Sequence, residues 1–129
     1  MRDCGAGRSE CVCWLLSSLD QPDRIVEVVH PHHSASAGHY DIDEAWLHGT
    51  WVSLAETGRQ VRAQMHTHPG AAYHSGRDDE FAAVQTPGFL SIVIPRFARA
   101  DDLTDAHLEE ISETGAWQSV AVQERLVIT

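Results

Sequence analysis

The segment "MHTHPGAAYHSGRDDEF", residues 65–81, determines how the rest of the chain is interpreted. It follows "VRAQM" (61–65), whose alternation of apolar and polar residues is typical of a strand with one face on a core. If that strand continues by two or three residues, His66 and His68 point to the same face, with Cα atoms about 6.5–7 Å apart. Pro69 would then end the strand. Two imidazoles at this spacing can converge on one metal ion, although a His-x-His pair alone is weak support.

The pair Ser75 and Asp78, three residues apart, has the spacing of a capping box at the start of a helix. Taken alone, the pair favours a helix cap and nothing more. A carboxylate in the first helical turn is also well placed to be a third metal ligand. Two histidines and one carboxylate leave a fourth position for water, as in catalytic zinc sites. His74 is the local alternative as fourth ligand, and it would make the site structural.

A hydrolytic metal site also needs a general base that is not itself a ligand. Glu80 is two positions from Asp78 and so lies on a different face of the expected helix. Glu10 opens the apolar run "ECVCWLL" (10–16), where a charge is either solvent-exposed or functional. Spacing alone leaves both possibilities open, and Glu27 on the next expected strand is a weaker alternative.

Together these residues resemble the JAMM motif of the JAB/MPN metalloproteases. That motif is an upstream Glu (Glu10), then His-x-His-Pro (66–69), then Ser-x-x-Asp (75–78). The later segment "PGFLSIVIPRFA" (87–98) is similar to the strand that follows the motif helix in prokaryotic JAB-domain proteins. The resemblance implies an α/β fold of the MPN (cytidine-deaminase-like) type, a mixed sheet flanked by helices, as a single domain over residues 1–129. One departure is that only nine residues precede Glu10, where family members usually carry a helix.

The resemblance also implies roles for individual residues. His66, His68 and Asp78 would bind Zn²⁺. Glu10 would be the general base for the attacking water and then protonate the leaving amine, and Ser75 would hydrogen-bond near the tetrahedral oxyanion. The implied partners are a ubiquitin-like protein or its conjugates, cleaved after a C-terminal Gly-Gly tail, and the enzymes of the conjugation pathway.

Two other classes of protein compete with this hypothesis. A catalytically inactive MPN scaffold would lack one or more motif residues, and the complete set argues against it. A zinc deaminase normally uses a His/Cys/Cys ligand set. No cysteine follows Cys13, so deamination is disfavoured.

The composition sets further limits. The 129 residues carry a formal charge of −10, which disfavours nucleic acid and anionic membranes as partners. The three cysteines, Cys4, Cys11 and Cys13, are odd in number and predict a reducing, cytoplasmic compartment. A Cys-x-Cys metal site is possible, but buried thiols are the favoured interpretation. No segment is typical of a transmembrane helix or a secretory signal.

The remaining pattern predicts the order of secondary structure elements. Asp41 or Asp43 can cap the first expected helix and Gly58 can end it. Its core face would carry Leu47, Trp51, Leu54 and Ala55. We expect an irregular start (1–9), strands (11–19, 24–30), a loop of solvent-exposed histidines (31–39), a helix (41–58), a strand (61–65), a helix from Ser75 with Phe81 and Val84 on its apolar stripe, a strand (88–95), an ambiguous segment that weakly favours strand (101–113), and a last strand (116–129).

Overall fold

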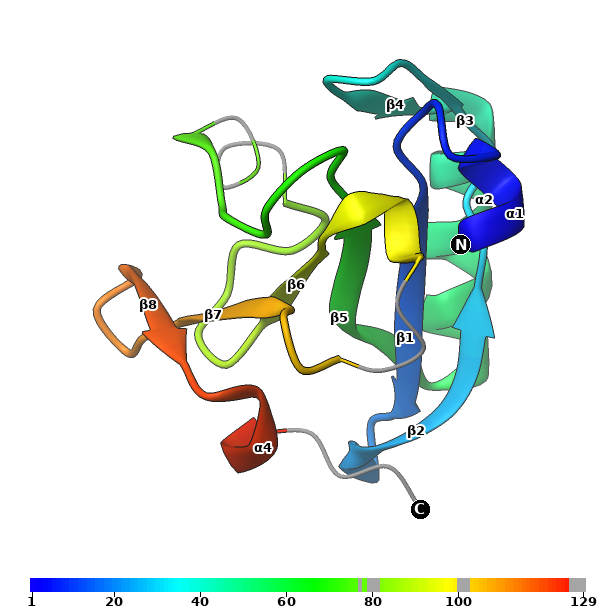
Figure 1. Ribbon diagram of the computed structural model, residues 1–129. Helices are drawn as coiled ribbons and strands as arrows, with labels where there is room; N and C mark the ends of the chain where they lie inside the picture. The colour runs from blue at the N-terminus through cyan, green and yellow to red at the C-terminus, as the bar shows by residue number, and fades with distance from the viewer. Residues whose placement is uncertain (77, 79–81, 100–102, 126–129) are drawn as a thin grey trace.

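The computed structural model describes residues 1–76, 78, 82–99 and 103–125. A mixed six-stranded sheet with the order β2-β1-β5-β6-β7-β8 forms the centre of the molecule, and β3 and β4 form a separate two-stranded hairpin (Figure 1). The strands are β1 (Val12–Ser18), β2 (Gln21–Val29), β3 (His33–Ala35), β4 (Tyr40–Ile42), β5 (Arg59–Thr67), β6 (Leu90–Ile94), β7 (His107–Ile111) and β8 (Trp117–Val120). The helices are α1 (Arg2–Gly5), α2 (Glu44–Thr57), the 3₁₀ turn η1 (Arg96–Ala98) and α4 (Val122–Arg125).

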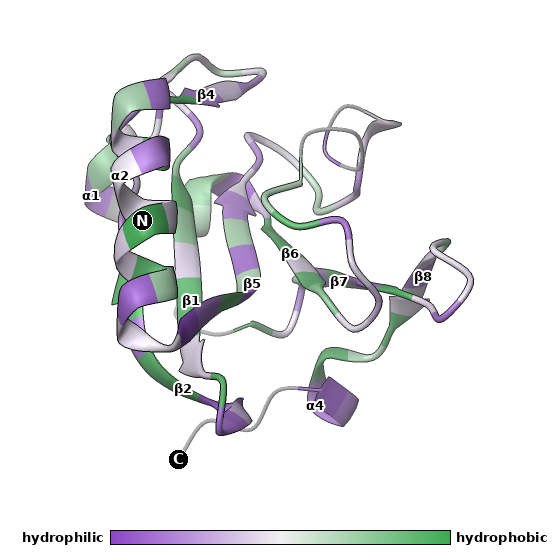
Figure 2. Cartoon of the chain, turned by 180° about the vertical axis from the view of Figure 1, so that it is seen from behind, coloured by the Kyte–Doolittle hydropathy of each residue, from purple (hydrophilic) through white to green (hydrophobic). Residues whose placement is uncertain are grey.

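Only β5 and β6 run parallel in the six-stranded sheet, and the other neighbouring strands described are antiparallel. Helix α2 covers one face, while α1 and η1 lie on the other, as the two opposite views show (Figures 1 and 2). This confirms the α/β class with a mixed sheet flanked by helices. No helix in the described part of the chain is long and apolar enough to cross a membrane.

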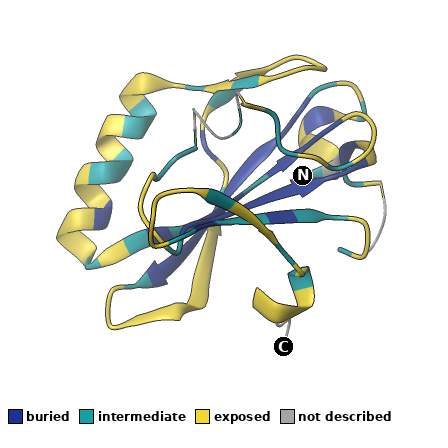
Figure 3. Ribbon diagram, turned by 90° about the vertical axis from the view of Figure 1, so that its left-hand side faces the viewer, coloured by how far each residue is buried: buried dark blue, intermediate teal, exposed yellow. Residues whose placement is uncertain are grey.

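The core beneath α2 is built around Trp14, which is completely buried in β1. Its ring contacts those of Trp46 and Trp51, with centroids 5.3 and 5.4 Å away. Leu54 is the buried residue of α2, whereas Ala55 is exposed, so the prediction that Ala55 belongs to the core face is wrong. The large aromatic side chains of Trp46 and Trp51 fill the space instead. The central strands are buried while the outer side of α2 is exposed (Figure 3).

Most predicted strands are confirmed, including β7 within the ambiguous segment 101–113. Two boundaries differ. Strand β2 begins at Gln21 and not at residue 24 as expected. It is an edge strand of the sheet, and an edge strand tolerates a proline such as Pro22. The last strand ends at Val120 and helix α4 follows it, so the expectation of a strand over 116–129 is wrong at residues 122–125, while residues 126–129 lie outside the described residues.

Two segments expected to be irregular are ordered. Residues Arg2–Gly5 form α1, which is too short to show a helical period in the sequence. The expected loop 31–39 contains β3 and leads into β4. His33 is only partly exposed there and contacts Cys4, so the prediction of solvent-exposed histidines is wrong for this residue.

Helix α2 begins as predicted at Asp43, whose side chain accepts a hydrogen bond of 2.8 Å from the backbone N–H of Trp46. It ends at Gly58 in the left-handed conformation. We expect Asp43→Ala to lower the free energy of unfolding by about 0.5–2 kcal/mol, because the cap is lost. Urea denaturation would measure this. Asp41→Ala is the matched control, and an equal loss in both variants would contradict a specific capping role.

Candidate metal centre

The sheet register places the candidate residues on one face. Val12 of β1 lies directly opposite His66 of β5 in an antiparallel pair. The ladder continues beyond β1, because the Thr67 backbone N–H donates to the Cys11 carbonyl at 3.0 Å. Side chains alternate across a strand. Glu10 lies two residues before Val12 and His68 two residues after His66, so all four side chains point to the same side. That side is the one covered by α2, since Val12 belongs to the core cluster that contains Leu54 of α2.

Three ligand atoms converge at the end of β5. The Nε2 atoms of His66 and His68 are 3.2 Å apart. Asp78 offers Oδ1 to His66 Nε2 at 3.2 Å and Oδ2 to His68 Nε2 at 3.5 Å. The His66 side chain is completely buried, and those of His68 and Asp78 are nearly so.

These distances fit a metal ion. In a tetrahedral zinc site with bonds of about 2.0–2.2 Å to nitrogen and oxygen, neighbouring ligand atoms lie about 3.3–3.6 Å apart. Two imidazole nitrogens and a carboxylate also place acceptor atoms so close that a proton or a cation must lie between them. The residues present therefore fit a divalent cation of the kind that prefers nitrogen and oxygen ligands.

The carboxylate of Asp78 is held ready to bind a cation. Burial alone would raise the pKa of Asp78, but its contacts with His66 and His68 and with the Ser75 backbone N–H hold that pKa well below its usual range. The Ser75 N–H donates to Asp78 Oδ2 at 2.7 Å, and Ser75 Oγ accepts from the Asp78 N–H at 3.2 Å. Ser75 and Asp78 thus form a reciprocal capping box. The Asp78 carboxylate is both a member of this box and a candidate metal ligand. Phe81 and Glu80 lie outside the described residues, and Val84 lies in an irregular segment.

Glu10 completes the group of predicted residues. Its side chain is almost fully buried, which excludes the alternative of a solvent-exposed charge before the strand. Glu10 Oε1 lies 3.9 Å from His68 Nε2, further than the three ligand atoms lie from one another. This position suits a group beside the metal shell rather than within it. Glu27 is elsewhere, bonded to Arg59 on the surface of the sheet edge.

A cleft of about 650 Å³ opens beside these residues. Glu10, His68, Ser75 and Asp78 line it. Its other walls come from the segment that leads into β4, from α2 and from Pro69, Tyr73, Ala82 and Ala83, and Trp14 and Trp51 supply an apolar surface. Two of the three candidate ligands, His68 and Asp78, therefore border this cleft.

His74 does not join the group of His66, His68 and Asp78. Its Nδ1 lies 3.9 Å from Glu109 Oε2, and it clusters with His107 and Glu109 of β7. Burial, with the neighbouring charges of His66 and His107, lowers the pKa of His74 to about 3, so this imidazole is neutral. The position predicted for water in the metal shell is thus not taken by His74.

Comparison with known proteins identifies the family. The model of the prokaryotic homologues of the JAB domain matches residues 3–108. The chain belongs to this family. The JAB-domain resemblance based on the sequence motif is therefore confirmed. The individual roles of Glu10, Ser75, His66, His68 and Asp78 stay predictions, although the structure brings all five residues to one site.

Similar proteins agree with this assignment. A probable metalloprotease of Sinorhizobium fredii, y4jG, is 40% identical over an alignment of 97 residues, and the match covers 72% of this JAB-domain chain and 60% of that protein. The chain thus spans only part of the length of this relative. Solution structures of proteins from Desulfitobacterium hafniense and Salinibacter ruber share the fold, with TM-scores of 0.58 and 0.55. They are 16% and 19% identical, and the matches cover 86% and 87% of this chain and 75% and 74% of the other chains.

The capping box leads to a prediction about metal affinity. We expect Ser75→Ala to weaken zinc binding by about 10–100-fold, because Asp78 loses the hydroxyl that anchors its own backbone. Competition with a chromophoric chelator would measure the change. Ser53→Ala, on the exposed side of α2, is the matched control. Unchanged affinity in Ser75→Ala would show that the cap does not support the ligand.

Proposed function

We propose that this chain is a zinc-dependent metallopeptidase that hydrolyses amide bonds after the C-terminal tail of ubiquitin-like proteins. The observation that carries the proposal is the buried Glu10 carboxylate beside the three converging ligand atoms of His66, His68 and Asp78. Membership of the JAB-domain family supports it, as does the relative described as a probable metalloprotease.

Each residue has a defined task in this proposal. Zinc, when bound, would polarise the scissile carbonyl and supply a nucleophile at neutral pH. Glu10 would take the proton of the attacking water on its carboxylate and return it to the nitrogen of the leaving amine. Ser75, which lines the same cleft, would donate its hydroxyl hydrogen to the developing oxyanion while its oxygen accepts from the Asp78 N–H.

The residues that line the cleft support an extended tail as substrate. One wall carries the β4 backbone, Tyr40–Ile42, to which an extended peptide could add as a strand. Asp41 and Glu44 on the cleft wall favour cationic residues further upstream in the tail.

The proposal is tested with a linear fusion of a ubiquitin-like protein, ending in Gly-Gly, to a reporter peptide. We expect cleavage directly after the second glycine, loss of cleavage with a chelator and recovery on addition of zinc. A fusion in which both glycines are replaced by valine is the matched substrate control. Equal cleavage of both fusions would contradict the proposed specificity, and zinc binding without cleavage of any fusion would favour the inactive scaffold.

A further inference from the structure

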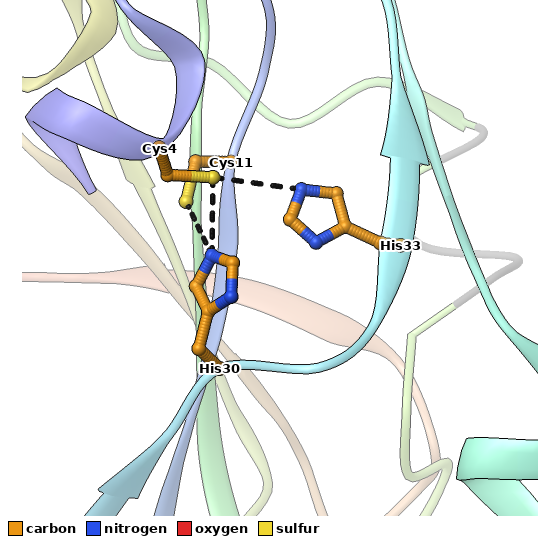
Figure 4. A group of neighbouring side chains, drawn as sticks. All are labelled: Cys4, Cys11, His30 and His33. Carbon is orange, nitrogen blue, oxygen red and sulfur yellow. Dashed lines mark hydrogen bonds between the residues drawn. The ribbon is translucent and has the colours of Figure 1, made fainter.

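A second group of ligand side chains lies on the other side of the sheet from the first. Side chains alternate along the strand, so Cys11 points away from the face that Glu10 and Val12 share. Cys11 lies there beside Cys4 of α1 and His30 after β2, and Cys4 in turn contacts His33 of β3 (Figure 4). Two stretches of the sequence, residues 4–11 and 30–33, thus bring two sulfurs and two imidazoles together.

The four ligand atoms are close enough to share one ion. Sγ of Cys11 and Sγ of Cys4 lie 3.1 and 3.0 Å from His30 Nε2, and Sγ of Cys4 lies 3.7 Å from His33 Nε2. All four atoms lie within 4.8 Å of one another. A tetrahedral zinc site with two sulfur and two nitrogen ligands has ligand separations of about 3.3–3.8 Å. The group therefore needs only small side-chain adjustments to enclose a zinc ion.

The surroundings orient these ligands. His33 Nδ1 lies 2.9 Å from the carbonyl oxygen of the buried Pro31. A hydrogen bond donated there fixes the tautomer in which Nε2 carries the free lone pair, as is usual for metal-binding histidines. Cys11 is completely buried, whereas Cys4 and His30 are exposed and border a surface pocket. The inner ligand is thus fixed by the sheet, and a metal ion can reach it from solvent.

We propose that Cys4, Cys11, His30 and His33 form a second, structural zinc site. Four protein ligands of the Cys₂His₂ type leave no position for water, which separates this site from the first one. Such an ion would fasten α1 and the β3–β4 hairpin to the start of β1. Cys11 directly follows Glu10, whose backbone N–H donates to the Ser36 carbonyl beside the hairpin at 2.8 Å. The second ion would therefore stabilise the backbone that holds Glu10 in the cleft.

Cobalt substitution tests this site independently of hydrolysis. The full chain, stripped of metal under reducing conditions and titrated with Co²⁺, is expected to bind two equivalents and to show a thiolate-to-cobalt charge-transfer band. Cys4→Ser and Cys11→Ser should lose the band and one equivalent. Cys13→Ser changes the cysteine outside the cluster and should keep the band and both equivalents of Co²⁺. His48→Ala on α2 should keep them as well.

His66→Ala separates the two sites, because it removes a nitrogen ligand of the first site only. We expect this variant to keep the charge-transfer band and to lose the equivalent of Co²⁺ that binds at the first site. A wild-type chain without the band would overturn the proposal, as would a band that survives in Cys4→Ser and Cys11→Ser alike. A Cys4–Cys11 disulfide, detected by mass after purification under reducing conditions, would also overturn it. His33→Ala should lose the band while its circular dichroism spectrum stays unchanged. That result would show that the loss of the band is not due to unfolding.

Discussion

Glu10→Gln is expected to lower kcat for cleavage of the ubiquitin-like fusion by about 10²–10⁴-fold, the usual contribution of a general base. The amide has nearly the shape of the carboxylate but cannot accept the proton of the attacking water. Because Glu10 lies outside the three converging ligand atoms, zinc content and KM should change little. Steady-state kinetics and metal analysis of the same preparations measure both quantities.

Glu27→Gln is the matched control, since Glu27 lies on β2 and contacts Arg59 at the sheet edge. It should retain full activity. A Glu10→Gln variant with wild-type kcat would exclude Glu10 as the base. A variant that lost its zinc would instead show that Glu10 is a ligand.

His66→Ala is expected to remove one equivalent of zinc and to reduce cleavage to the background rate. The variant loses a completely buried ligand and leaves Asp78 facing His68 alone. Zinc at a thousand times its dissociation constant stabilises a folded protein by about 4 kcal/mol, so the zinc-dependent rise in Tm should become smaller in the variant. Thermal unfolding with and without zinc measures this difference.

His48→Ala, on the exposed surface of α2, controls for the general loss of a histidine. It should keep the full zinc-dependent rise in Tm. If His66→Ala also kept the full rise and the full metal content, the converging atoms at the end of β5 would not be the metal site.

The first site was accessible from sequence because its residues follow simple periodicities. His66 and His68 share a strand face, and Ser75 and Asp78 share a helical turn, so each pair could be placed from spacing alone. The relation of Glu10 to these pairs required the family resemblance, because antiparallel pairing of Val12 with His66 cannot be derived from spacing.

The second group of ligands was not accessible in the same way. Cys4 lies in a helix of four residues, His30 follows β2, and His33 opens β3 in a segment that was expected to be a loop. Their convergence depends on how α1 packs and how β2 leads into β3, and no local period encodes either. The sequence signal that could have pointed to them was the pair of cysteines, Cys4 and Cys11, upstream of a run rich in histidine.

His74 shows a further limit of local reasoning. Its place in the sequence between His68 and Asp78 suggested a fourth ligand, but its ring turns toward His107 and Glu109 of β7. Those two residues alternate on one strand face, which is the only hint the sequence carries. Contacts between distant strands decided the orientation of His74.

Anomalous diffraction at the zinc absorption edge, from crystals grown with zinc, would locate the metal ion in the proposed site. We expect a zinc peak bound by His66 Nε2, His68 Nε2 and one carboxylate oxygen of Asp78, with solvent in the fourth position and Glu10 within reach of that solvent. A crystal with no peak between these three side chains would contradict the account. A peak whose fourth ligand is the Glu10 carboxylate would contradict it as well.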